Sequence, residues 1–98
     1  MKYAVLSLQQ HSENTAEFGF GDYCENILYI ALVVDADTER KAQNAAKKVF
    51  PRMRFSGQFG ARMLPVNEKF MRLYATPTDA RLSPKAQELH NASLQALA

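Results

Sequence analysis

The sequence holds few of the residues from which disulfide, metal or catalytic sites are usually built. It has one cysteine, Cys24, two isolated histidines, His11 and His90, and no tryptophan. A single cysteine excludes an intrachain disulfide and favours a reducing, cytoplasmic location. Neither histidine has the closely spaced partners of a zinc site, so we expect two surface histidines, no metal and no cofactor.

Long apolar runs are also missing. The longest, residues 27–34, is too short to cross a bilayer as a helix, so we expect no membrane partner. The chain has 98 residues, of which 47% are hydrophobic and 22% are charged. These values are typical of one soluble globular domain, which we expect to cover residues 1–98.

Basic residues are rare in the first third of the chain, and acidic residues are rare in the second third. Residues 1–39 contain seven acidic residues against one basic residue, Lys2, and residues 40–72 contain nine basic residues against one acidic residue, Glu68. The overall charge of +2 therefore hides a segment of −6 and a segment of +8. Such a separation favours an acidic partner for the basic segment. The alternative is that the acidic third folds over the basic third and neutralises it.

Residues 27–34 are the apolar centre of the chain. The run is short, rich in β-branched residues and bounded by polar residues, which predicts a strand. Its two faces carry Ile27, Tyr29, Ala31 and Val33, and Leu28, Ile30, Leu32 and Val34. A strand that is apolar on both faces belongs in the middle of a covered sheet or pairs with another chain. We therefore predict that residues 27–34 form the central strand.

An amphipathic helix is predicted over residues 38–50. Its apolar stripe, with the spacing i, i+3, i+4, i+7 and i+8, consists of Ala42, Ala45, Ala46, Val49 and Phe50. Either Asp37 or Thr38 can cap its first turn, and Pro51 ends it. The small alanines allow this helix to lie close to a sheet.

The other elements are less sharply marked in the sequence. Residues 3–8 and 52–59 alternate as strands do, and residues 62–64 suit a further short strand. Residues 9–14 are polar and predict a loop or a hairpin turn, and residues 21–26 predict the connection into the apolar run. Residues 15–20 are a weaker strand candidate. Residues 66–75 fit a short helix slightly better than a strand. Ser83 and Pro84 are a good start for a final helix.

Together these elements predict an α+β fold with a small, mostly antiparallel sheet. The helix at 38–50 would cross over on one face of the central strand, and short C-terminal helices would cover the remainder. If the C-terminal helices left the second face of residues 27–34 open, a second subunit would have to cover it. A homodimer is therefore an alternative.

A short motif resembles a known catalytic one. The segment from Leu32 to Thr38 is an apolar strand that ends in Asp35-Ala36-Asp37-Thr38, and it resembles the first motif of the haloacid-dehalogenase-like phosphotransferases. That resemblance implies Asp35 as a nucleophile, Asp37 as general acid and base, and a Mg²⁺ ion between them. The acids that follow Glu39 are Glu68, Asp79 and Glu88, which are widely separated. The competing interpretation is that the acids between the strand and the next helix cap the start of that helix.

A second short motif, Gly57-Gln58-Phe59-Gly60, resembles the loop of the KH RNA-binding module, which clamps a nucleic-acid backbone. The resemblance implies RNA binding at this loop. Neither of the two central residues is basic, and Pro65 interrupts the segment where the module has a helix. Relief of strain at the end of a strand also explains two glycines at this spacing.

The basic segment offers the leading functional hypothesis. We expect a non-catalytic interaction protein that presents a basic helix and strand face to an acidic protein surface. The alternative is a nucleic-acid-binding module that uses the same face, and a metal-assisted phosphotransferase at Asp35 and Asp37 is the remote one. The candidate binding residues are Arg40, Lys41, Lys47, Lys48, Arg52, Arg54 and Arg62.

Overall fold

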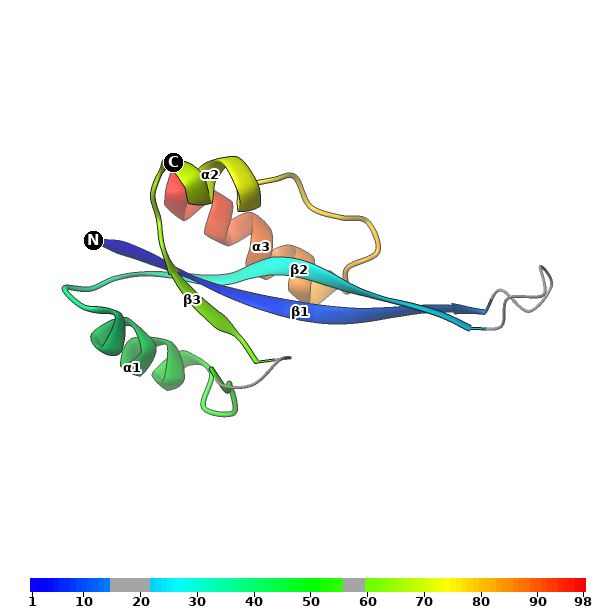
Figure 1. Cartoon of the computed structure of the whole chain (residues 1–98), viewed down its shortest axis with the longest axis horizontal. Coiled ribbons are helices and arrows are strands. Elements are labelled where there is room, and N and C mark those ends of the chain that lie inside the picture. Colours follow the sequence, from blue (N-terminus) through cyan, green and yellow to red (C-terminus); the bar gives the residue numbers. More distant parts are fainter. Residues whose placement is uncertain (15–21, 56–59) are drawn as a thin grey trace.

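The computed structural model describes residues 1–14, 22–55 and 60–98, which form one antiparallel sheet and three helices (Figure 1). The strands are β1 (Lys2–Asn14), β2 (Asp22–Asp35) and β3 (Arg62–Pro65). The helices are α1 (Glu39–Val49), α2 (Glu68–Tyr74) and α3 (Pro84–Leu97). This arrangement confirms the predicted α+β class.

The middle strand of the sheet is β1, because the strand order is β2-β1-β3. The prediction that residues 27–34 are the central strand is therefore corrected: they belong to β2, which lies at one side of β1. The prediction was based on the two apolar faces of residues 27–34. Helices cover both faces of the sheet, so a strand at its side also buries two apolar faces. Since β2 and β3 are each antiparallel to β1, they run in the same direction, and α1 connects them.

The β1–β2 hairpin is longer than the sequence predicted. Residues 9–14 and 22–26 were expected to lie in loops, yet they continue the pairing from Gln9 with Ile27 to Asn14 with Asp22. Backbone hydrogen bonds hold two antiparallel strands together whether or not their side chains are apolar, so polar residues do not end the ladder. Figure 1 shows this end of the hairpin extending past the helices. The strand expected over residues 15–20 lies outside the described residues.

The third strand is shorter and later than the expected strand over residues 52–59. Residues 53–55 have no regular structure, and residues 56–59 lie outside the described part of the chain. Strand β3 instead matches the short strand expected at 62–64, and it pairs with the first residues of β1, from Tyr3 with Pro65 to Leu6 with Arg62. Alternation of polar and apolar residues alone did not distinguish a strand from an extended connection.

A bulge changes which residues of β2 face which layer. Val5 pairs with Leu32 and Leu6 pairs with Ile30, so Ala31 is the extra residue on β2. Ala31 and Leu32 consequently pack in the same cluster, whereas strict alternation assigned them to opposite faces. The alternation predicted for residues 3–8 is confirmed at the start of β1, where Tyr3 and Val5 lie on one side and Ala4 and Leu6 on the other.

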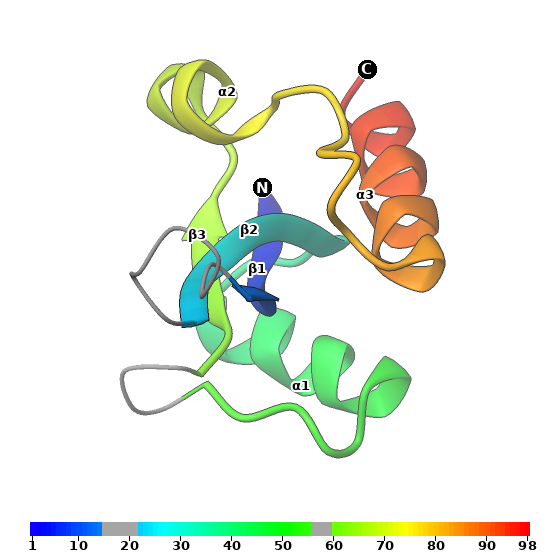
Figure 2. The ribbon, with the colours of Figure 1, turned by 90° about the vertical axis from the view of Figure 1, so that its right-hand side faces the viewer.

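The helices form a layer on each face of the sheet (Figure 2). On one face, Ala42 and Ala46 of α1 are fully buried against Val5. On the other face, Phe70 of α2 packs with Leu6 and Ile30, and Leu94 and Leu97 of α3 lie against this cluster. Both helical layers thus bury apolar surface on the same short sheet, which is the main source of its stability.

The sequence offered Thr38 as one of two caps for the first helix and Ser83 as the start of the last, and both are confirmed. Thr38, Asn67 and Ser83 are the N-caps, and their side-chain oxygens accept hydrogen bonds from the backbone N–H groups of Lys41, Phe70 and Ala86. The segment 66–75 is therefore helical at α2, as the sequence favoured. None of the helices in the described part of the chain is both long and apolar enough to span a membrane.

Candidate functional site

The outer face of α1 is strongly basic. Arg40, Lys47 and Lys48 are exposed, on the side of the helix away from the buried Ala42 and Ala46. The N-cap at Thr38 orients the first turn, and the helix ends where the Phe50 N–H donates to the Ala46 carbonyl at 2.8 Å. Burial of the alanines therefore dictates that the basic side chains point into solvent.

The remaining basic candidates follow α1 along the chain. A tight turn joins Phe50 to Met53, whose N–H donates to the Phe50 carbonyl at 3.0 Å, and Arg52 is exposed on this turn. The Ala61 N–H donates to the Arg54 carbonyl at 2.7 Å, which brings Arg54 beside the start of β3. All seven residues that the sequence nominated are exposed: Arg40, Lys41, Lys47, Lys48, Arg52, Arg54 and Arg62.

Most of these cations have no carboxylate partner among the residues that the structure describes. The exception is Lys41, whose Nζ lies 3.5 Å from the Asp37 carboxylate in a highly exposed pair. Acids of the first third have other partners: Asp35 binds the N-terminal ammonium group at 3.1 Å, and Glu25 pairs with Arg81. In the described part of the chain, Asp37 is therefore the one acid of the first third that forms an ion pair with the basic face.

The two acids of the phosphotransferase-like motif lie at the junction between β2 and α1. Asp35 accepts from the N-terminus, Asp37 pairs with Lys41 in the first turn of the helix, and Thr38 supplies the N-cap. No group of three or more His, Cys, Asp or Glu side chains suited to a metal occurs within residues 1–14, 22–55 and 60–98. Thr38, and neither of the two acids, therefore caps α1, which corrects the interpretation that the acids are the cap. The Gly57–Gly60 motif falls largely outside the described residues.

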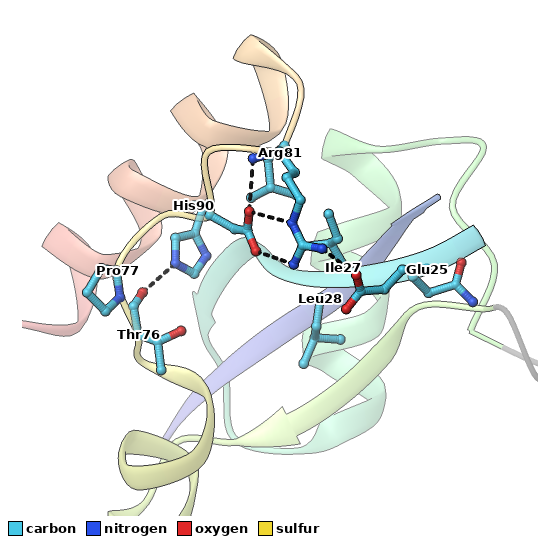
Figure 3. A pocket seen from close by; sticks show the side chains of 10 residues that line it. Glu25, Ile27, Leu28, Thr76, Pro77, Arg81 and His90 are labelled. Atoms are coloured by element: carbon cyan, nitrogen blue, oxygen red, sulfur yellow. Dashed lines mark hydrogen bonds and ion pairs between the residues drawn. The ribbon is translucent and has the colours of Figure 1, made fainter. Parts of the chain in front are cut away.

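A polar pocket of about 350 Å³ lies between β2, the segment that precedes α3, and α3 itself (Figure 3). Arg81 occupies one wall and is held from two sides. Its Nε and Nη2 atoms donate to the two carboxylate oxygens of Asp79, at 3.1 Å and 2.8 Å, and its Nη1 atom binds Glu25 of β2. The hydrogen bonds from the Arg81 side chain and backbone lower the pKa of Asp79 to about 2.

The same contacts act on the guanidinium. The hydrogen bonds to Asp79, and to a smaller extent the one to Glu25, raise the pKa of Arg81 further above its ordinary value. Arg81 therefore keeps its charge at every accessible pH, and it fastens the segment before α3 to β2. The sequence shows no sign of this contact, because Glu25 and Arg81 are far apart in the chain.

His90 is buried, which corrects the prediction that it is a surface histidine. It is 3% exposed, its Nδ1 atom accepts from the Ile30 N–H at 3.0 Å, and its Nε2 atom lies 2.7 Å from the Thr76 carbonyl oxygen. A backbone N–H can only donate and a carbonyl can only accept, so the ring is neutral with its proton on Nε2. His90 thus satisfies a backbone group on the outer edge of β2.

The polar groups around this pocket hold neighbouring parts of the fold together. Both nitrogens of His90 are engaged, and the carboxylates of Asp79 and Glu25 are bound to Arg81, so these groups already have partners. The one available signal for the burial of His90 was its spacing. His90 follows Ala86 by four residues and precedes Ser93 by three, and these three residues form the buried stripe of α3.

Comparison of the chain with protein-family models, with curated proteins and with solved structures found no match. The assignment of a function therefore depends on the geometry described above.

Proposed function

We propose that this chain is a small, non-catalytic interaction protein of a reducing, cytoplasmic compartment that binds an acidic protein surface through the outer face of α1 and the segment after it. The observation that supports this most directly is electrostatic. Five exposed cations lie on α1 or directly after it without a carboxylate partner among the described residues: Arg40, Lys47, Lys48, Arg52 and Arg54. Such a surface attracts negative charge over a distance of about 8–10 Å at moderate salt. Arg62 is also exposed, but it alternates with Met63 on β3 and shares its side of the strand with Leu64, so it lies on the sheet face away from α1.

Nucleic acid is the second candidate, since phosphates would be attracted to the same surface. The aromatic residues near the basic face favour a protein partner instead. Phe50 and Phe55 pack against the cluster between α1 and the sheet, so they are not free to stack on bases. Proteins that bind single strands usually combine cations with exposed aromatic rings, and here the described residues supply the cations alone.

A paired charge reversal tests the proposal. We expect the double variant Lys48→Glu with Arg52→Glu to bind poly-glutamate at least about tenfold more weakly than the wild type at low salt, because each reversal changes a weak attraction into a repulsion. The matched control is Lys69→Glu with Arg72→Glu, which makes the same charge change on exposed residues of α2, across the sheet from α1. Affinity can be measured by fluorescence anisotropy.

The control variant on α2 shows whether a loss of affinity comes from the basic face of α1 or from the change in net charge. Equal losses in the two double variants would show that net charge, and not this face, determines binding, and would contradict the proposal. A salt titration with generic single-stranded DNA and RNA tests the second candidate, because phosphate contacts make affinity fall steeply as salt rises. Negligible binding at low salt would exclude nucleic acid as the partner.

A further inference from the structure

An apolar groove of about 370 Å³ lies beside the basic face. Its floor includes Tyr29 and Ala31 of β2. Phe50 and Met53 form one wall, directly after α1, and Leu89 of α3 is part of the opposite wall. Leu89 is half-buried and belongs to none of the core clusters within the described residues. Leu89 therefore offers the groove apolar surface that the core does not use, whereas Tyr29, Ala31, Phe50 and Met53 each turn one side to the core and another to the groove.

Local hydrogen bonds hold both walls in place. The turn from Phe50 to Met53 closes through its backbone bond, and Pro51 suits the second position of such a turn. On the other side, the Gln9 side chain accepts from the Ser83 N–H at 2.8 Å and donates to the Arg81 carbonyl at 3.1 Å. These two bonds tie the start of α3 to β1. The groove is therefore formed before any partner arrives, which lowers the entropic cost of binding.

The charges around the groove have one sign. Lys85 is its sole charged lining residue, and no carboxylate is among the lining residues that the structure describes. Lys47 and Lys48 occupy the last turn of α1, immediately before Phe50, and Arg52 lies between Phe50 and Met53 in the chain. These cations, which we call the cationic rim, are therefore the charges nearest to this wall of the groove along the chain.

We propose that the groove receives a bulky apolar side chain from an acidic segment of the protein partner, whose carboxylates lie against the cations at the end of α1. This inference rests on the proposed function and names the chemistry of the partner. An apolar anchor in a preformed pocket supplies most of the affinity in many protein interfaces, while the charged rim sets orientation and specificity. The groove and the rim together match a partner segment in which acidic residues flank one or two large apolar residues.

Three synthetic peptides of equal length test this inference. The first carries glutamates on both sides of a leucine–phenylalanine pair, the second has serines in place of that pair, and the third has glutamines in place of the glutamates. We expect the first peptide to bind about tenfold or more tightly than the second, because the groove buries an apolar side chain. We also expect it to bind more tightly than the third at low salt, but not at high salt.

Variants of the groove identify where the apolar pair binds. We expect Leu89→Gln and Met53→Gln to reduce the affinity of the first peptide to that of the serine peptide. The matched controls are Leu73→Gln and Met71→Gln, which change the same residue types at exposed positions on α2, and these should bind as the wild type does. Thermal melts establish that each variant is folded. Leu89→Gln keeps the test valid if Met53→Gln, which also touches the core, unfolds.

The outcomes separate the two proposals. If Lys48→Glu weakens binding but neither groove variant does, the groove inference is wrong and the proposed function stands. If the glutamine peptide binds as tightly as the glutamate peptide at low salt, the acidic partner itself is contradicted. Absence of binding by all three peptides at low salt overturns the inference. So does a dimer of the wild type that dissociates in Leu89→Gln, because the occupant is then a second copy of this chain.

Discussion

The imidazole of His90 provides the most direct test of how the sheet edge is stabilised. In His90→Leu, the Ile30 N–H and the Thr76 carbonyl lose their partners, while the side-chain volume changes little. A buried polar group without a hydrogen bond costs about 1–3 kcal/mol. The Ile30 N–H is buried, whereas Thr76 is exposed and its carbonyl can bond to water instead. The free energy of unfolding should therefore fall by about 1–3 kcal/mol, which for a chain of this length corresponds to a fall in Tm of roughly 5–20 °C.

Urea denaturation followed by circular dichroism measures this loss. His90→Gln is the informative companion, because its amide offers one acceptor and two donors, and we expect it to recover part of the stability. Gln95→Leu places a leucine at an exposed position of the same helix and should change stability by less than about 0.5 kcal/mol. The reasoning is refuted if His90→Leu unfolds at the same urea concentration as the wild type.

Two further predictions concern the ion pair between Asp79 and Arg81 and the N-cap of the first helix. Because the pKa of Asp79 is lowered to about 2, its pairing with Arg81 stabilises the fold above the unfolded pKa near 4 and loses that effect as the pH falls toward 2. The difference in urea midpoint between the wild type and Asp79→Asn should therefore be constant above about pH 5 and shrink below pH 4, and a constant difference down to pH 2 would contradict this. The second prediction is that Thr38→Ala lowers the free energy of unfolding by about 1 kcal/mol through loss of the N-cap of α1, whereas Thr38→Ser is nearly neutral. Equal stability of the two Thr38 variants in the same assay would show that the cap contributes nothing.

The chemistry of the chain follows from where its few ionisable clusters lie. Asp79 and Glu25 both pair with Arg81 beside the pocket, and the nitrogens of His90 are hydrogen-bonded to the backbone. The cations of α1 are the contrasting case, since most of them have no such partner among the described residues. This contrast is the reason why we propose recognition of an acidic partner.

Local features were determined by the sequence alone. The caps at Thr38, Asn67 and Ser83 and the alanine stripe of α1 depend on residues within one or two turns, and short-range hydrogen bonding decides them. The outward direction of the basic residues on α1 follows from that stripe, because side chains opposite a buried face must meet solvent. The α+β class follows from the order of the same elements.

Only the tertiary structure decided the features that depend on distant pairs. The position of β1 in the middle of the sheet and the bulge at Ala31 are set by register between strands, which local pattern does not encode. The burial of His90 requires the edge of β2 and Thr76 to meet it from two other parts of the chain. The groove beside α1 likewise exists because the Phe50–Met53 turn and α3 are brought to the same edge of β2, although they are far apart in the sequence.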